Sequence, residues 1–348
     1  MKKKSINTWI YVLFVIGASI ILSTFVILFA NDAFALTKQK ATVYVNIPEN
    51  ASKGQIASVL KDAGLIEYKG LFKLFMGLAH VKRGDIKQGR YTLDTSYDYR
   101  AMISIMKNPK QYRQTVRLTI PEGYTTEQIV SLLYTNGVCG EDELWDAIAN
   151  YDFDFDFLSG IEKNNHRLEG YLYPDTYEFY LGDTPENALS RFLGNFDAKF
   201  TGTMKSKAKE LGYSMHEIIT IASIIEREAK LASEQPVIAG VIYNRLKSRS
   251  LPYLQIDASV QYALGHKEKL TYADLEIDSP YNTYKYKGLP IGPISNPGME
   301  AILAALNPEK HNYYYYVADT DGSHIFSSTL AQHEAAKKKV AGKQSSDN

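Results

Sequence analysis

A carboxyl group at the end of an isoleucine-rich segment is the first candidate for chemistry in this sequence. The segment is Ser214–Ala229 (SMHEIITIASIIEREA), and Glu226 follows a nearly uninterrupted apolar run from Ile218 to Ile225. A helix that is apolar all round is buried, and partial removal of a carboxyl group from water favours its neutral form. A neutral glutamic acid can donate a proton near neutral pH. Taken alone, the segment fits better with a helix that simply surfaces and leaves Glu226 solvated.

The element that must position Glu226 has its own signals in the sequence. Ser214 and Glu217 have the S-x-x-E spacing of a capping box, which predicts a helix that begins at Ser214. Glu228 is two residues beyond Glu226 and points elsewhere on such a helix, so we expect it to have a structural or solvated role.

The other common catalytic chemistries lack their signatures. The chain has no H-E-x-x-H, no G-x-S-x-G and no phosphate-binding glycine loop, and its seven histidines are scattered. Asp152–Phe157 alternates Asp with Phe, but Phe157 occupies the position where a calcium loop needs glycine. We therefore expect no metal and no cofactor. Balanced charge, with 39 basic and 39 acidic residues, gives no reason to expect nucleic acid as a partner. Acid catalysis by carboxyl groups remains.

The N-terminus predicts a membrane anchor. Residues 9–30 form an uncharged apolar run, long enough to span a bilayer as a helix. Lys2, Lys3 and Lys4 before it predict a cytoplasmic N-terminus, formed by residues 1–8. The bulk of the chain is then extracytoplasmic, beginning with a linker at 31–42. A cleaved signal peptide with Ala33–Ala35 as its cleavage site is the alternative. The run is longer than a usual signal core, which favours the anchor.

An internal repeat predicts two small βα units in the rest of the chain. Val45–Glu49 and Leu118–Glu122 have similar sequences, and each precedes a Gln-Ile pair and a later glycine at the same spacing. Each copy has the pattern of a strand, a turn and an amphipathic helix, and Thr125 or Thr126 can cap the second helix. Further on, Tyr313–Val317 and His324–Phe326 predict a buried strand and its hairpin partner across Asp321-Gly322.

Several motifs together resemble the membrane-anchored endolytic murein transglycosylases. They are Ile221–Glu228, Leu168–Tyr177, Leu254–Asp257, Ser279–Tyr284, Gly288–Pro290 and His324–Phe326, which occur in that family's order. The resemblance covers about 165–335, and the first βα module resembles the family's LysM-like subdomain. It implies an α+β fold with one N-terminal transmembrane helix, a LysM-like module at 43–112 and a catalytic domain at 113–336. We expect a disordered tail at 337–348.

The resemblance also implies a reaction. Glu226 matches the family's catalytic acid/base, and the substrate is the β-1,4 bond between N-acetylmuramic acid and N-acetylglucosamine in nascent peptidoglycan strands. The muramyl C6 hydroxyl would attack C1 and leave a 1,6-anhydro end, in a lyase reaction that needs no second carboxylate. Candidates for substrate positioning are Gln255, Asp257, Tyr281, Asn282 and Tyr284, together with the carboxylates Glu169 and Asp175. For the first five residues, a purely structural role in their loops is equally plausible. For the Leu168–Tyr177 stretch, which carries the two carboxylates, packing against the core is equally plausible.

Two other functions fit the sequence. One is a muramidase that uses water, with Asp257 or Glu169 as the second carboxylate. The other is a non-catalytic scaffold that binds the cell wall and recruits peptidoglycan synthases. Under the leading hypothesis the partners are glycan strands, the membrane, and penicillin-binding proteins or other synthases.

Overall fold

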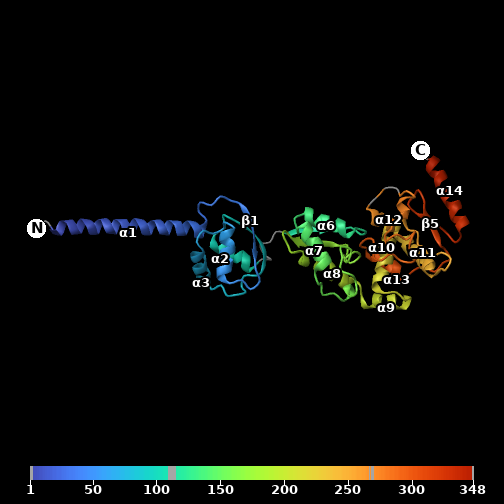
Figure 1. Cartoon of the computed structure of the whole chain (residues 1–348), viewed down its shortest axis with the longest axis horizontal. Coiled ribbons are helices and arrows are strands. Elements are labelled where there is room, and N and C mark those ends of the chain that lie inside the picture. Colours follow the sequence, from blue (N-terminus) through green and yellow to red (C-terminus); the bar gives the residue numbers. More distant parts are fainter. Residues whose placement is uncertain (1–2, 109–114, 266, 268–269, 347–348) are drawn as a thin grey trace. The chain divides into compact units, whose positions relative to one another are not determined.

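The chain divides into two units, each with its own hydrophobic core. The structure is a computed structural model that describes residues 3–108, 115–265, 267 and 270–346 (Figure 1). One unit contains residues 1–115 and 180–184, and the other contains 116–179 and 185–348. Helices and short strand pairs occur in the described parts of both, so the fold is α+β, as predicted. The predicted boundary at 112/113 lies outside the described residues.

The first element, α1 (Lys3–Phe34), is one continuous helix. Its part from Thr8 to Phe34 is long and apolar enough to cross a membrane, by length and composition, and it contains the predicted span 9–30. Its large apolar side chains, such as Trp9, Leu13 and Phe14, are exposed. Apolar side chains exposed in this way fit a bilayer better than water, so α1 is compatible with a single-pass anchor.

A small βα module follows α1 in the same unit. Its elements are β1 (Thr42–Ile47), α2 (Lys53–Asp62), α3 (Lys69–Leu78), β2 (Gly89–Asp94) and α4 (Tyr99–Lys107). Strands β1 and β2 pair antiparallel, with Thr42 opposite Asp94 and Ile47 opposite Gly89. The core between this strand pair and the helices includes Leu60, Phe72, Tyr91 and Met102. These elements span Thr42 to Lys107, so the module begins one residue before the predicted range 43–112. Its LysM-like character stays a prediction.

The internal repeat corresponds to two strand–helix units with the same cap. In the first, Ser52 caps α2 and Gln55 completes a capping box; in the second, Thr125 caps α6 (Thr126–Thr135) and Gln128 completes it. Each hydroxyl accepts from the third backbone N–H of its helix, while the glutamine side chain accepts from the capping residue's own N–H. The repeat predicted both helices.

The second unit contains the remaining elements. Its first part contains β3 (Thr115–Thr119), α6, α7 (Glu141–Asn150), a 3₁₀ turn at Asp156–Leu158, β4 (Thr176–Tyr180), α8 (Pro185–Lys199) and α9 (Gly202–Leu211). Strands β3 and β4 pair with each other. Its second part contains α10 (Met215–Glu228), α11 (Gln235–Lys247), α12 (Asp257–Leu264), α13 (Met299–Leu306), β5 (Tyr315–Ala318), β6 (His324–Ser327) and α14 (Leu330–Ser346), with 3₁₀ turns at Ala232–Glu234 and Asp274–Glu276.

Helix α10 lies in the middle of this second core. Every residue from Ile218 to Ile225 is buried, and α11 and α13 pack against the helix. The capping box predicted at its start is present, because Ser214 accepts from the N–H of Glu217 and the Glu217 side chain accepts from the N–H of Ser214. The buried length ends one residue before Glu226, so the two carboxyl groups that follow emerge where the helix leaves the core.

The C-terminal region differs from the predicted disordered tail. Strands β5 and β6 form the predicted antiparallel hairpin, although β5 is half-buried instead of buried. Helix α14 packs against this hairpin and continues to Ser346. Ala336 and Val340 are buried, and Lys343 Nζ lies 2.5 Å from Asp319 Oδ2. The expectation of disorder from 337 is corrected for 337–346: the polar composition concealed a narrow apolar face on a surface helix. Residues 347–348 lie outside the described residues.

Candidate active site

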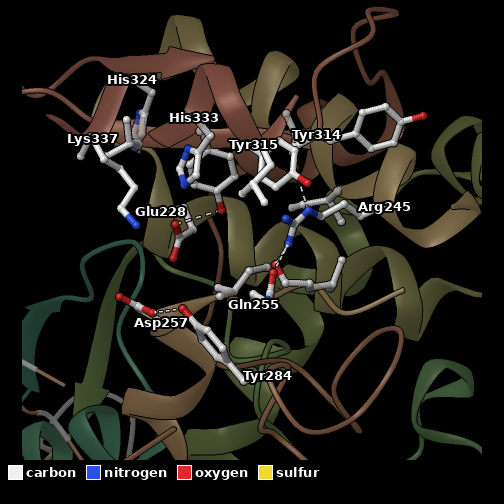
Figure 2. Close-up of a pocket in the computed structure, with 18 of the residues that line it drawn as sticks. Glu228, Arg245, Gln255, Asp257, Tyr284, Tyr314, Tyr315, His324, His333 and Lys337 are labelled. Atoms are coloured by element: carbon white, nitrogen blue, oxygen red, sulfur yellow. Dashed lines mark hydrogen bonds between the residues drawn. The ribbon is translucent and has the colours of Figure 1, made fainter. Parts of the chain in front are cut away.

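The C-terminal end of α10 opens into a pocket of about 590 Å³ (Figure 2). Glu228 lines this pocket, together with side chains from α11, the loop before α12, the Tyr284 loop, the β5–β6 hairpin and α14. Three of the predicted substrate-positioning residues line it as well: Gln255, Asp257 and Tyr284. Glu226 does not line it. The structure therefore brings these predicted residues to the neighbouring carboxyl group, Glu228.

The Glu228 carboxyl group is held by a hydroxyl and surrounded by charges of both signs. Tyr316 on β5 donates a hydrogen bond of 3.0 Å to Glu228 Oε2. Burial raises the pKa of Glu228, and the negative charge of Asp257 raises it further. The hydrogen bond from Tyr316 and the nearby His324 oppose this rise in the pKa, but the net shift is upward. In Figure 2 Glu228 lies between Asp257 on one side and His324 and His333 on the other. This environment favours the neutral form of the carboxyl group, which is the form that can donate a proton.

Asp257 and Tyr284 form one wall of the pocket. Asp257 is the first residue of α12, where the helix dipole favours a negative charge. Tyr284 Oη donates a hydrogen bond of 2.5 Å to Asp257 Oδ1 (Figure 2). The Asp257 residue is exposed, so a ligand in the pocket can reach its carboxylate. The pair therefore supplies a fixed negative group and an aromatic ring beside Glu228.

A buried arginine holds the floor of the pocket. Arg245 on α11 donates to the backbone oxygens of Tyr314, Tyr253 and Leu254 at 2.7, 3.0 and 2.7 Å. It also donates to Gln255 Oε1 at 3.3 Å. Gln255 adopts a left-handed backbone conformation, with φ of 54°, which costs energy for a non-glycine residue. Arg245 thus ties the loop before α12 to the start of β5.

A histidine–glutamate pair holds the opposite wall. His324 Nδ1 lies 2.6 Å from Glu234 Oε2, and the His324 backbone N–H donates to Glu234 Oε1 at 2.9 Å. This double contact fixes the imidazole at the start of β6, on the pocket side. The His324 side chain therefore adds a polar group near Glu228.

Glu226 occupies a different environment on the other side of α10. Its Oε2 accepts a hydrogen bond of 3.0 Å from the backbone N–H of Gly298, the residue that precedes α13. Burial raises its pKa, and the negative charges of Glu122 and Glu300 add to that rise. The Glu226 side chain also lies beside Gly123, where an added Cβ atom would be in ordinary van der Waals contact with Glu226 Cγ, at 3.5 Å. Glu226 thus fastens the start of α13.

Glu169 is a buried structural hub. It is 2% exposed and accepts hydrogen bonds from Thr126 N, Tyr262 Oη and Asn296 Nδ2 at 2.9–3.1 Å. Burial raises its pKa to about 7. It lines another pocket, with His166, Tyr262 and Arg227, and not the pocket of Glu228. Its acceptor positions are taken by the protein, so it joins the start of α6, helix α12 and the loop before α13.

The remaining predicted positioning residues lie outside the Glu228 pocket. Asn282 is fully buried, and its amide donates to the backbone oxygens of Leu275 and Ile277 at 2.8 and 2.9 Å. Tyr281 is buried, with its ring 4.8 Å from that of Tyr262. Asp175 accepts from Asn195 Nδ2 at 3.0 Å, next to β4. These three residues have structural partners in the loops that carry the pocket.

Sequence reasoning missed Glu228, Tyr316, Arg245 and His333 as pocket residues. The i, i+2 spacing of Glu226 and Glu228 was the available signal, because it places the two carboxyl groups about 200° apart around a helix. Only the partners across the fold decide which of the two enters the pocket. Within the described residues, no group of three or more His, Cys, Asp or Glu side chains is arranged to hold a metal ion.

The fold places a pocket that contains a glutamic acid at the end of a buried helix, and the sequence that forms this fold matches the model of a known protein family. The model of the YceG-like family matches residues 45–339, which is most of the chain. The chain therefore belongs to the YceG-like family.

Individual relatives agree with this assignment. The endolytic murein transglycosylase of Bacillus subtilis (strain 168) is 35% identical over 315 residues, covering 86% of this chain and 85% of the relative. The endolytic murein transglycosylase of Streptococcus pneumoniae (strain D39) is 31% identical, over 85% of this chain but 58% of that longer protein. The crystal structure of a yceG-like protein from Listeria monocytogenes matches with a TM-score of 0.56 and 33% identity, covering 86% of this chain and 100% of that one.

Proposed function

We propose that this protein is an endolytic peptidoglycan lytic transglycosylase and that Glu228 is its catalytic acid/base. One observation carries the proposal: Glu228 has a raised pKa and lines the pocket that also contains Asp257 and Tyr284. The names of the relatives, endolytic murein transglycosylase, support the reaction class. The sequence alone favours Glu226 as the acid. We propose Glu228 instead, because the Glu226 carboxylate lies outside this pocket and accepts a hydrogen bond from the Gly298 N–H.

The reaction needs a single group that first donates and then accepts a proton. Neutral Glu228 donates its proton to the glycosidic oxygen as the bond between muramyl C1 and that oxygen breaks. The resulting carboxylate takes the proton from the muramyl C6 hydroxyl, whose oxygen then bonds to C1. The products are a 1,6-anhydro muramyl end and a new N-acetylglucosamine hydroxyl, and Glu228 is again protonated. A raised pKa suits both steps, since the group must be neutral at the start.

Neighbouring side chains would assist the reaction without forming or breaking covalent bonds themselves. The Asp257 carboxylate raises the pKa of Glu228, and its negative charge would stabilise positive charge that develops at C1. Tyr316 holds Glu228 by a hydrogen bond, and His324, which is itself held by Glu234, lies close enough to lower the pKa of Glu228. The rings of Tyr284 and Tyr315 line the cavity and offer apolar faces for sugar rings.

Hydrolysis by a muramidase is the second candidate function, and the position of Asp257 favours it. An ordinary glycosidase needs a second carboxylate near the acid, and Asp257 lines the same pocket as Glu228. Glu169, the other carboxylate that the sequence offers for this role, lines a different pocket and has its acceptors occupied. The hydrolytic reaction would leave reducing ends instead of anhydro ends.

Mass spectrometry of glycan strands digested by the purified protein tests the proposal. We expect 1,6-anhydro ends from wild type, none from Glu228→Gln, and anhydro ends again from Glu226→Gln. Reducing ends from the wild type would establish hydrolysis. No cleavage by the wild type, with normal in vivo function of Glu228→Gln, would instead establish a non-catalytic scaffold.

The N-terminal helix would place the enzyme at the membrane, close to the synthases that make its substrate. A helix long enough to span the bilayer supports a single-pass anchor, and lysines before it support a cytoplasmic N-terminus with the pocket outside. Anchored there, the enzyme would act on strands as they emerge from penicillin-binding proteins or other synthases. A protease added to cells stripped of their wall, with the membrane intact, tests the orientation: it should degrade the second unit, whereas a cytoplasmic second unit would stay protected until the membrane is permeabilised.

A further inference from the structure

The junction between α1 and the first module is a fixed joint built on one buried carboxylate. Asp32, 1% exposed, accepts from the backbone N–H groups of Glu67 and Tyr68 at 2.8 and 2.9 Å. Lys38 Nζ lies 2.9 Å from the same carboxylate, and the Tyr99 hydroxyl donates to it. Phe29 packs edge-on against the Tyr68 ring at 5.1 Å. Tyr68 is the residue that precedes α3, so the end of α1 holds the start of α3.

Helix α3 carries apolar side chains on two opposite faces. Phe72 and Met76 are fully buried in the core of the module. Leu74 and Leu78, one turn apart on another face, are 60% and 72% exposed. The helix is ten residues long, so Leu78 lies within about 15 Å of the start that Asp32 holds. Figure 1 draws α3 at the end of the module where α1 enters.

A groove between α3 and α4 continues this apolar face and adds positive charge. Phe75, Leu78 and Ile103 line it, with Arg100 and Lys107 of α4. None of the described residues that line the groove is acidic. Lys73, which is exposed, adds a third cation beside Leu74. Asp85 lies 3.5 Å from Lys107 and offsets part of this positive charge.

We propose that the exposed face of α3 and the α3–α4 groove rest on the bilayer surface and bind anionic phospholipid headgroups. The inference rests on the anchor part of the proposed function. A segment held by a fixed joint at the end of a membrane-spanning helix lies at the interface, where apolar side chains flanked by lysine and arginine bind anionic lipid. Phe34 and Leu36, 61% and 70% exposed at the same junction, extend the apolar surface. The first module is thus a foot that orients the chain on the membrane.

Fluorescence of the reconstituted full chain tests this contact. An environment-sensitive label is attached at Leu74→Cys or Leu78→Cys in a Cys139→Ala background, in vesicles of phosphatidylcholine with or without phosphatidylglycerol. Tyr44→Cys is the matched control, because Tyr44 is a similarly exposed residue, 60%, on β1 of the same module. We expect a blue-shifted emission and several-fold stronger quenching by spin-labelled lipid at 74 and 78 than at 44, increasing with phosphatidylglycerol.

Charge reversal separates the headgroup contact from the apolar one. In Lys73→Glu/Arg100→Glu, the increase caused by phosphatidylglycerol should disappear. If the labels at 74 and 78 gave the same emission and quenching as the label at 44 in both lipids, the proposal would be overturned. The exposed face of α3 would then contact water or another protein instead of lipid. An increase that survives charge reversal would overturn the headgroup part. Glycan cleavage measured on the same vesicles tests the proposed enzyme independently, since none of these residues lines the Glu228 pocket.

Discussion

Glu226 and Glu228 are two residues apart on α10, yet their carboxylates have separate partners on different sides of the helix. Glu226 accepts from the backbone N–H of Gly298 at the start of α13, and Glu228 accepts from the hydroxyl of Tyr316 on β5. Both have raised pKa values because both are partly buried. A raised pKa therefore does not distinguish the two residues, whereas the pocket does.

Matched substitutions at these two positions give the first prediction. Glu228→Gln should lower kcat for glycan cleavage by at least 10²- to 10⁴-fold, roughly the contribution of a general acid, because the amide cannot donate the required proton. Glu226→Gln keeps an oxygen for the Gly298 N–H, so activity should stay within a few-fold of wild type. Release of anhydro-muropeptides gives the rates, and melting curves confirm that both variants fold. The opposite ranking of the two variants would refute the assignment of Glu228.

Much of the scaffold could be predicted from the sequence, because the signals were local. The capping box at Ser214, the repeat with its two capped helices and the hairpin at Asp321-Gly322 depend on residues a few positions apart. The choice of Glu228 depends on Tyr316, which is 88 positions away in sequence. Asn282 shows the same limit: its amide is suited to binding sugar, but nearby backbone oxygens occupy it. Local patterns do not reveal which polar groups the fold has already satisfied.

The pH dependence of catalysis gives a second prediction. Substitutions at two neighbours of Glu228 should shift the pH profile in opposite directions. Activity requires neutral Glu228, so it should fall as the pH rises through the pKa of this group. Tyr316→Phe removes a hydrogen bond that lowers this pKa, and should move the alkaline limb of kcat/KM to higher pH. Asp257→Asn removes a negative charge that raises the pKa, and should move the same limb to lower pH.

The two shifts are distinguishable from simple structural damage. Damage lowers kcat/KM at every pH without moving the limb, so the full profile from about pH 4 to 9 must be recorded for each variant. Tyr284→Phe is a useful control, since it removes the hydroxyl that holds Asp257 but leaves the carboxylate in place. Two variants that shift the limb in the same direction would contradict the proposed role of Glu228.

Glu169 gives a third prediction, for stability instead of activity. Its pKa is about 7 in the folded protein against an ordinary 4.5, so the folded state binds the proton more tightly than the unfolded state. The resulting stabilisation is complete below about pH 4.5 and is lost as the pH rises through 7. It amounts to roughly 3 kcal/mol at most. In Glu169→Gln this component is absent, so the melting temperature of the second unit should depend less on pH between 5 and 7. Equal slopes for variant and wild type would exclude the shift.

The joint at Asp32 gives the fourth prediction. Asp32→Ala leaves the buried N–H groups of Glu67 and Tyr68 without their acceptor, which should destabilise the start of α3 by about 1–3 kcal/mol. Hydrogen exchange on the full chain in detergent should then be faster at peptides that contain residues 67–72, and much less changed at the β1–β2 pair. Asp62→Ala, at an exposed position on α2, should leave exchange in both regions as in wild type. Asp32→Asn keeps one acceptor oxygen and should fall between the two. If exchange at 67–72 is the same in Asp32→Ala as in Asp62→Ala, the carboxylate does not hold α3, and the module is tethered to α1 by its chain alone.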